Sequence, residues 1–179
     1  MIFFTADQHF DHENIIEFCK RPFKTVRLMN HAIIKNNNEI VTNDDIVYHL
    51  GDITLRGPVS INVVRQFIGK LKGQKHLILG NHDRLTPKQY LNVGFLSVHT
   101  SLELEIENLI LVHDPALSAV DRKRVFLCGH VHDLFKTIKN VINVGVDQWD
   151  FKPVSLHEIR ELIENEVILK NLNQRRYNG

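Results

Sequence analysis

The sequence is poor in cysteine, carries almost no net charge and contains no long hydrophobic run. Its two cysteines do not form the CxxC pair of a structural metal site, and they fit a reducing compartment. The net charge of +1 argues against an extended surface for nucleic acid or anionic membrane, although it permits a nucleotide-sized ligand. No apolar run approaches the roughly 18 residues of a transmembrane helix, and the opening MIFFTADQHF does not resemble a signal peptide. We therefore expect a cytoplasmic protein that does not contact the membrane.

Internal repeats and low-complexity linkers are also absent from the sequence. With 179 residues, of which 43% are hydrophobic and 24% charged, the composition is that of an ordinary globular protein. We expect residues 1–179 to form a single domain without a separate cap domain. The residue type in excess is histidine, with 11 copies. Because histidine is the commonest protein ligand for transition metals, this excess favours a metal-binding function.

Short apolar runs and helix-like stretches alternate in the first half of the chain. Runs rich in Ile, Val, Leu and Phe are typical of buried strands, and they occur at 2–7, 45–52, 76–81, 109–114, 124–130 and 140–146. Helical periodicity is expected at 13–20, 27–41 and 59–71, and Ser155 with Glu158 forms a capping box for a last helix. The order of these elements predicts an α/β protein whose sheets are covered by helices.

Five of the six apolar runs end in side chains that bind metals. These side chains are Asp7, His9, Asp52, Asn81, His113, His130 and His132. Each one alone fits an ordinary turn or a packed histidine, but ligands of open α/β sheets bind outside the carboxyl ends of the strands. The set therefore predicts one shared site. Its oxygen and imidazole donors suit Mn, Fe, Zn, Co or Ni better than Ca.

Taken together, these motifs resemble a known family. Asp7-x-His9, Gly51-Asp52, Gly80-Asn81-His82-Asp83, His113 and Gly129-His130-x-His132 resemble, in that order, the five signature blocks of the calcineurin-like metallophosphoesterase superfamily. Within it, HFDHENIIEFCKRPF (9–23) and NVGVDQWDFKPVSL (143–156) are similar to a group of small single-domain bacterial and phage phosphoesterases. The resemblance implies a four-layered αββα sandwich with a dinuclear metal centre at the C-terminal ends of the strands.

The resemblance also implies a role for each motif residue. One metal would be held by Asp7, His9 and His132, and the other by Asn81, His113 and His130. Asp52 would bridge the two divalent transition-metal ions, for which manganese is favoured and iron, zinc, cobalt and nickel are alternatives. A hydroxide bridging the metals would attack phosphorus in line. His82 would act as the general acid, or alternatively would only orient its loop.

The expected function is the metal-dependent hydrolysis of small phosphomonoesters or phosphodiesters, with nucleotides among the candidates. The alternatives are a non-catalytic scaffold of the same fold and a module that binds phosphate without hydrolysing it.

Leu55 occupies the position of the second Asp in GDxxDRG, the block of the protein-phosphatase branch, which weakens a protein-phosphatase interpretation. Arg56 and His12 are candidate substrate-binding residues. Asp83 either orients His82 or hydrogen-bonds the turn.

Residues 10–26 are the best candidate for a substrate-binding loop. They combine aromatic, amide and cationic side chains in Phe10, His12, Asn14, Arg21 and Phe23. Such a mixture predicts either recognition of a base and its phosphate or a packed helical cover. A further histidine, His49, is expected to pack within its strand.

Overall fold

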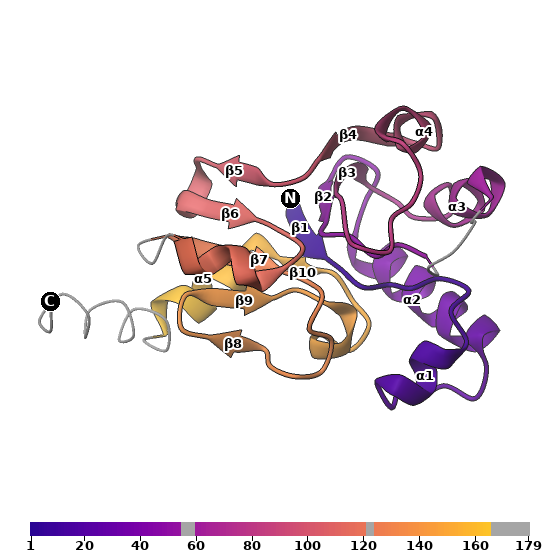
Figure 1. Ribbon diagram of the computed structural model, residues 1–179, viewed down its shortest axis with the longest axis horizontal. Coiled ribbons are helices and arrows are strands. Elements are labelled where there is room, and N and C mark those ends of the chain that lie inside the picture. The colour runs from indigo at the N-terminus through magenta and orange to yellow at the C-terminus, as the bar shows by residue number, and fades with distance from the viewer. Residues whose placement is uncertain (55–59, 121–123, 166–179) are drawn as a thin grey trace, which may run out of the picture.

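The computed structural model describes residues 1–54, 60–120 and 124–165 of the chain. Among these residues the strands form two five-stranded sheets, and Figure 1 shows how they lie. The first sheet has the order β10 (Val154–Ser155), β1 (Ile2–Thr5), β2 (Ile46–His49), β3 (Gln74–Ile78) and β4 (Phe95–His99). The second has the order β5 (Leu102–Leu104), β6 (Leu109–Leu111), β7 (Val125–Cys128), β9 (Val141–Asn143) and β8 (Thr137–Ile138).

The central strands of both sheets are parallel. β1 to β4 run parallel to one another, and only β10 joins that sheet in the opposite direction. β6, β7 and β9 are likewise parallel, with the antiparallel strands β5 and β8 at the edges. Parallel strands place their carboxyl ends on the same edge of a sheet. The residues that follow β1, β2 and β3 therefore lie together, as do those that follow β6 and β7.

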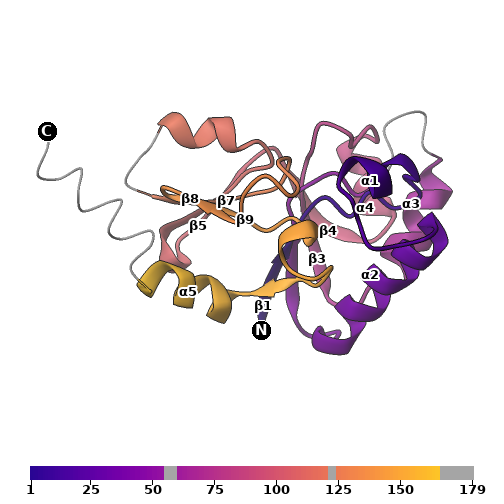
Figure 2. The ribbon, with the colours of Figure 1, turned by 90° about the horizontal axis from the view of Figure 1, so that it is seen from below.

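The helices are placed mainly on the outer side of the first sheet. They are α1 (Asn14–Phe18), α2 (Val26–Ile40), α3 (Ile61–Ile68), α4 (Pro87–Asn92) and, near the end, α5 (Leu156–Glu164). Figure 2 shows α2 and α3 on one side of the first sheet and the second sheet on the other. Short 3-10 helices lie at Ile106–Asn108 (η1), Pro115–Val120 (η2) and Val146–Gln148 (η3). The predicted α/β fold, in which two sheets lie between helices, is confirmed. In the described part of the chain, the short helix η2 contacts β7 of the second sheet.

Two hydrophobic clusters hold these layers together. The cluster between the sheets contains Phe4, Leu50, Leu109 and Leu127, and α5 closes it with Ile159. The cluster between the first sheet and its helices contains Met29, Ile33, Val64, Phe67 and Tyr90. Because apolar side chains from both faces of β1 and its neighbours are buried, these strands appear in the sequence as continuous apolar runs rather than alternating ones.

Helix ends follow from local sequence signals. Thr25 caps α2 by accepting a hydrogen bond from the Leu28 amide, and Ser155 with Glu158 forms the predicted capping box of α5. α4 was not predicted from the sequence. Its signal was present, because Thr86 and Gln89 form a second capping box with Pro87 at the first helical position.

Candidate metal centre

The side chains predicted as ligands of the second metal converge after β3, β6 and β7. Nε2 of His113 and Nδ1 of His130 each lie 2.9 Å from Oδ1 of Asn81. Nε2 of His113 also lies 3.5 Å from Oδ2 of Asp52. Atoms that coordinate one ion at about 2.1 Å lie roughly 3.0–3.4 Å apart in octahedral or tetrahedral geometry. The Asn81–His113, Asn81–His130 and Asp52–His113 distances are close to this range, which agrees with donors around a common divalent ion.

The side chains predicted for the first metal form a second group beside it. Ligand atoms of Asp7, His9 and His132 all lie within 4.8 Å of one another. His9 is 1% exposed, and both of its ring nitrogens are buried without a hydrogen-bond partner among the described residues. A buried nitrogen without a partner is costly, and a metal ion would satisfy one of the two. This group also fits a metal site.

Asp52 lies between the two groups. Its Oδ2 is 3.6 Å from Nε2 of His9 and 3.5 Å from Nε2 of His113, so one oxygen faces both ligand sets. Its Oδ1 accepts a hydrogen bond of 2.8 Å from the His82 amide, which fixes the orientation of the carboxylate. A carboxylate in this position can bridge two cations and offset their mutual repulsion.

The ionisable groups of the centre have pKa values shifted in opposite directions, because burial and neighbouring charges compete there: burial raises the pKa of Asp7, whereas Asp147 raises that of His132 in spite of burial. Burial lowers the pKa of His9 well below its ordinary value, which leaves its ring neutral and able to bind a metal. Burial opposes ionisation of Asp52, but the hydrogen bond and charge of His113 outweigh it and hold the pKa of Asp52 at about 2. For His113 the balance is reversed, because Asp52 and Asp7 raise its pKa in spite of burial. The carboxylates thus attract positive charge to this position.

The backbone is strained at the same place. Asp7, His9, Asp52, His130 and His132 all have positive φ angles, between 47° and 73°. Residues other than glycine rarely adopt this left-handed conformation, and such strain is concentrated at functional sites. Five of the seven predicted ligands share it. Tight left-handed turns at the strand ends are what turn these side chains toward a common point.

Gly51 and Gly80 allow two of these turns to approach each other. A Cβ on Gly80 would overlap Oδ1 of Asp52, and a Cβ on Gly51 would lie 2.7 Å from Nδ1 of His113. Gly51 also has a φ of +90°, which L-residues rarely adopt. The absence of side chains at these two positions is therefore required for the ligands to meet.

His82 lies beside the ligands and its loop is braced by Asp83. Nε2 of His82 is 3.8 Å from Oδ2 of Asp52, and its ring lies edge-on to the His9 ring at 5.2 Å. Asp83 accepts hydrogen bonds from the amides of Asp52, Gly80 and Ile53 and from the Tyr90 hydroxyl. Of the two roles left open for Asp83, these contacts support hydrogen bonding of the turn.

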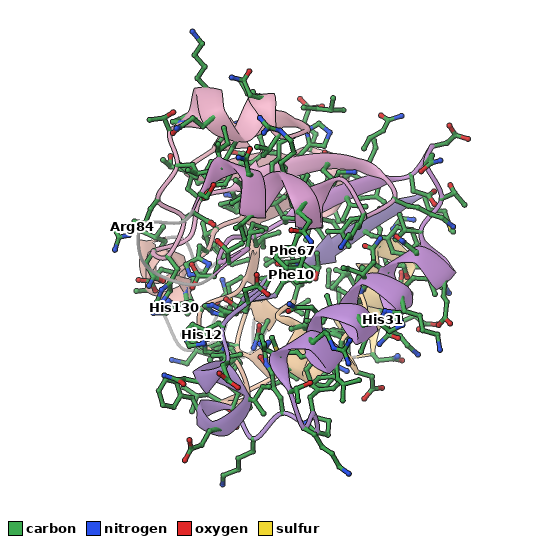
Figure 3. The ribbon with its side chains drawn as sticks, turned by 90° about the vertical axis from the view of Figure 1, so that its right-hand side faces the viewer. Phe10, His12, His31, Phe67, Arg84 and His130 are labelled. Carbon is green, nitrogen blue, oxygen red and sulfur yellow. The ribbon has the colours of Figure 1, made fainter. Side chains whose placement is uncertain are left out.

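The candidate substrate residues have different surroundings. The His12 ring lies 5.5 Å from the His9 ring, and His12 and His130 line one cavity, on the side of α1 in Figure 3. Arg56 and Leu55 lie outside the described residues. Phe10 is fully buried and stacks on Phe67, so it belongs to the helical cover rather than to a binding surface.

Two contributors to the centre were not assigned to it by the sequence analysis. Arg21, interpreted there as a loop residue, is 4% exposed and hydrogen-bonds the backbone oxygens of Asp7 and Gln8. Asp147, whose Oδ2 lies 3.4 Å from Nδ1 of His132, was missed. The available signal was the GVDQWD segment, which places an acidic residue directly after the apolar run 140–146, as at the other ligand positions.

The fold and the clustered His and Asp side chains define a phosphoesterase-type α/β sandwich. The family model for the calcineurin-like phosphoesterase superfamily domain matches residues 2–160, and the chain belongs to this superfamily.

Among its relatives, an uncharacterized protein of Methanocaldococcus jannaschii is 34% identical over 96% of both chains. The gene 66 protein of Mycobacterium phage D29 is 28% identical over 92% of this chain and 96% of its own length. A solved structure, of a protein of unknown function from Aquifex aeolicus, superposes with a TM-score of 0.71 and 28% identity, covering 91% of this chain and 99% of the other. The resemblance to the superfamily is therefore confirmed, and it extends over nearly the whole chain.

None of the helices in residues 1–54, 60–120 and 124–165 combines the length and the apolar character needed to cross a membrane.

Proposed function

We propose that the protein is a metal-dependent hydrolase of small phosphate monoesters or diesters, with nucleotides as the first candidates. The observation that supports it most strongly is the position of Asp52, whose Oδ2 faces His9 of one ligand set and His113 of the other within 3.6 Å. Membership of the phosphoesterase superfamily agrees with this chemistry.

In this proposal the two ligand sets hold two divalent transition-metal ions, with manganese favoured over iron, zinc, cobalt and nickel. When bound, such ions lower the pKa of water from about 15.7 toward roughly 7 and polarise the phosphoryl group. Asp7 and Asp52 offset only part of the positive charge of two divalent ions. The centre would therefore retain a positive charge toward an anionic ester.

His82 is proposed as the proton donor to the leaving oxygen. Its Nε2 faces the carboxylate between the two ligand sets at 3.8 Å, and its side chain is 23% exposed, so it contacts both the centre and the cavity. Positioned acids of this kind contribute about 10²–10⁴-fold to a rate. Asp83 supports this arrangement indirectly, because it fixes the turn that carries His82 against the Asp52 backbone.

The experiment that tests the proposal measures hydrolysis by protein reconstituted with manganese. The substrates are p-nitrophenyl phosphate, bis(p-nitrophenyl) phosphate, nucleoside monophosphates and cyclic nucleotides, each with and without a chelator. We expect turnover of at least one ester class that stops when the metal is removed. A protein that binds two metal ions per chain but hydrolyses none of these esters would instead be a phosphate-binding module or scaffold.

A further inference from the structure

The cavity over the candidate metal centre extends beyond the histidines. It has a volume of about 510 Å³ and is lined by five histidines, His9, His12, His82, His130 and His132. Four apolar side chains, Ile15, Phe18, Val131 and Leu134, also line it, together with Cys19 and Asp133. A volume of this size is typical of pockets that bind small molecules, and a phosphate group alone would fill only a fraction of it.

Two of the apolar side chains at this cavity are unusually exposed. Phe18 is 69% exposed at the end of α1, and Leu134 is 78% exposed in the turn after β7. Neither belongs to a hydrophobic core cluster of the described residues. Large exposed apolar side chains that line a cavity commonly mark a binding surface. Their exposure is not explained by the packing of the fold.

The His12 ring connects Phe18 to the other histidines that line the cavity. The His12 ring lies 6.2 Å from the Phe18 ring and 5.5 Å from the His9 ring. These spacings are those of rings in direct contact, so His12 and Phe18 form a continuous aromatic surface to which a planar ring can add by an offset or edge-on contact. A ligand with a phosphate at His9 and an aromatic ring near Phe18 would contact both the histidines and the apolar side chains of the cavity.

We propose that Phe18, Leu134 and His12 bind the planar aromatic ring, nucleobase or aryl, of the phosphate ester whose phosphoryl group lies at the histidines. This inference rests on the proposed function and specifies its substrate class. It predicts that the protein selects esters by the ring in their organic part. Esters with a small aliphatic group would gain contacts at the histidines only.

Binding of non-hydrolysable phosphonates to the manganese-loaded protein tests this inference without relying on turnover. Calorimetry should give tighter binding for phenylphosphonate than for methylphosphonate. Phe18→Ala should weaken phenylphosphonate binding about 3- to 10-fold and leave methylphosphonate binding unchanged. Leu117→Ala is the matched control, because Leu117 is 50% exposed on η2 and does not line the cavity. Phe18 is itself so exposed that its replacement should not impair folding.

Equal affinities of wild-type protein for the two phosphonates would overturn the inference, as would an equal loss of both in Phe18→Ala. A third probe, adenosine 5′-phosphonate, separates the two ring types: tighter binding than phenylphosphonate identifies a nucleobase site, and weaker binding an aryl site. Selective binding of ring-bearing phosphonates by a protein that hydrolyses no ester would support the ring site and contradict the proposed hydrolase function. Ester hydrolysis by a protein that shows no preference for ring-bearing phosphonates would support the hydrolase function and contradict the ring site.

Discussion

Arg21 and Asp147, which are 126 positions apart, form a buried bidentate ion pair next to the candidate metal centre. Nε and Nη2 of Arg21 each lie 2.8 Å from one carboxylate oxygen of Asp147. The same guanidinium donates to the backbone oxygens of Asp7 and Gln8, and Oδ2 of Asp147 lies 3.4 Å from Nδ1 of His132. The pair therefore connects the two segments that supply the first ligand set.

This connection predicts that Asp147 orients His132 toward a metal. Carboxylates that contact the second nitrogen of a ligating histidine typically change metal affinity about 10–100-fold when they are replaced. Asp147→Asn should therefore weaken manganese binding to the first set by about that factor, measured by calorimetric titration of chelator-treated protein. Asp150→Asn, an exposed change three residues away, is the control. Unchanged affinity in a folded Asp147→Asn protein would exclude this positioning role.

Gly80→Ala should prevent the ligand turns from meeting. The added Cβ would overlap the Asp52 side chain and lie 2.5 Å from the Asp52 amide nitrogen, so the backbone must move. Gly94→Ala is the control, because it strains the backbone without a steric overlap. Gly94 has a φ of +116°, but the nearest atom to an added Cβ would be 3.6 Å away. We expect Gly94→Ala to cost about 1 kcal/mol of unfolding free energy without affecting metal content. Gly80→Ala should lose more stability and also lose metal, as measured by urea unfolding and elemental analysis. Full metal content in Gly80→Ala would contradict the close packing of these turns.

His49 should make stability depend on pH. Burial, together with the charges of Lys75 and His76, lowers the pKa of His49 to about 3, whereas the unfolded residue titrates near 6.5. Between these values the unfolded chain binds a proton that the folded protein does not bind, so stability falls as pH decreases. The slope contributed by this residue is about 1.4 kcal/mol per pH unit.

His49→Gln should remove that part of the slope between about pH 6 and 4, as measured by urea unfolding at each pH. His31→Gln, an exposed position on α2 labelled in Figure 3, should leave the slope unchanged. If the His49 variant keeps the wild-type slope, His49 is protonated in the folded protein.

Replacing His82 should separate catalysis from metal binding. His82→Ala removes the proposed proton donor while leaving all seven predicted ligands in place. Turnover of a poor leaving group, such as a nucleoside monophosphate, should therefore fall about 10²–10⁴-fold. Turnover of p-nitrophenyl phosphate should fall less, because its leaving group needs little protonation. An equal loss of turnover and bound metal would make His82 a structural residue of the loop.

The strands that carry ligands could be predicted from the sequence because their signals are local. Each has a buried apolar run followed directly by a polar side chain, and each of the six predicted runs overlaps a strand in the structure. β8 and β10 were not predictable in this way, because two-residue strands have no periodicity of their own. They form because β1 and β9 present backbone N–H and C=O groups with which β10 and β8 pair.

The parts of the site that depend on distant contacts were harder to predict. The bracing of the turn by Asp83 depends on the Asp52 and Ile53 amides, which lie 30 positions away or more and donate to its carboxylate. Arg21 has the sequence context of an exposed loop cation, and its burial depends on Asp147 at the other end of the chain. Phe10 likewise follows a ligand but points into the helical core. Position in the sequence therefore did not show which side chains of residues 10–26 are buried in the helical core and which line the cavity.

Anomalous diffraction from crystals of the manganese-loaded protein would show whether Asp52 joins two metal sites. We expect two anomalous peaks per chain, about 3.5–4 Å apart, one on each side of Oδ2 of Asp52. One peak should lie among Asp7, His9 and His132, and the other among Asn81, His113 and His130. A single peak, or two peaks without Asp52 between them, would show that Asp52 does not bridge two metal ions.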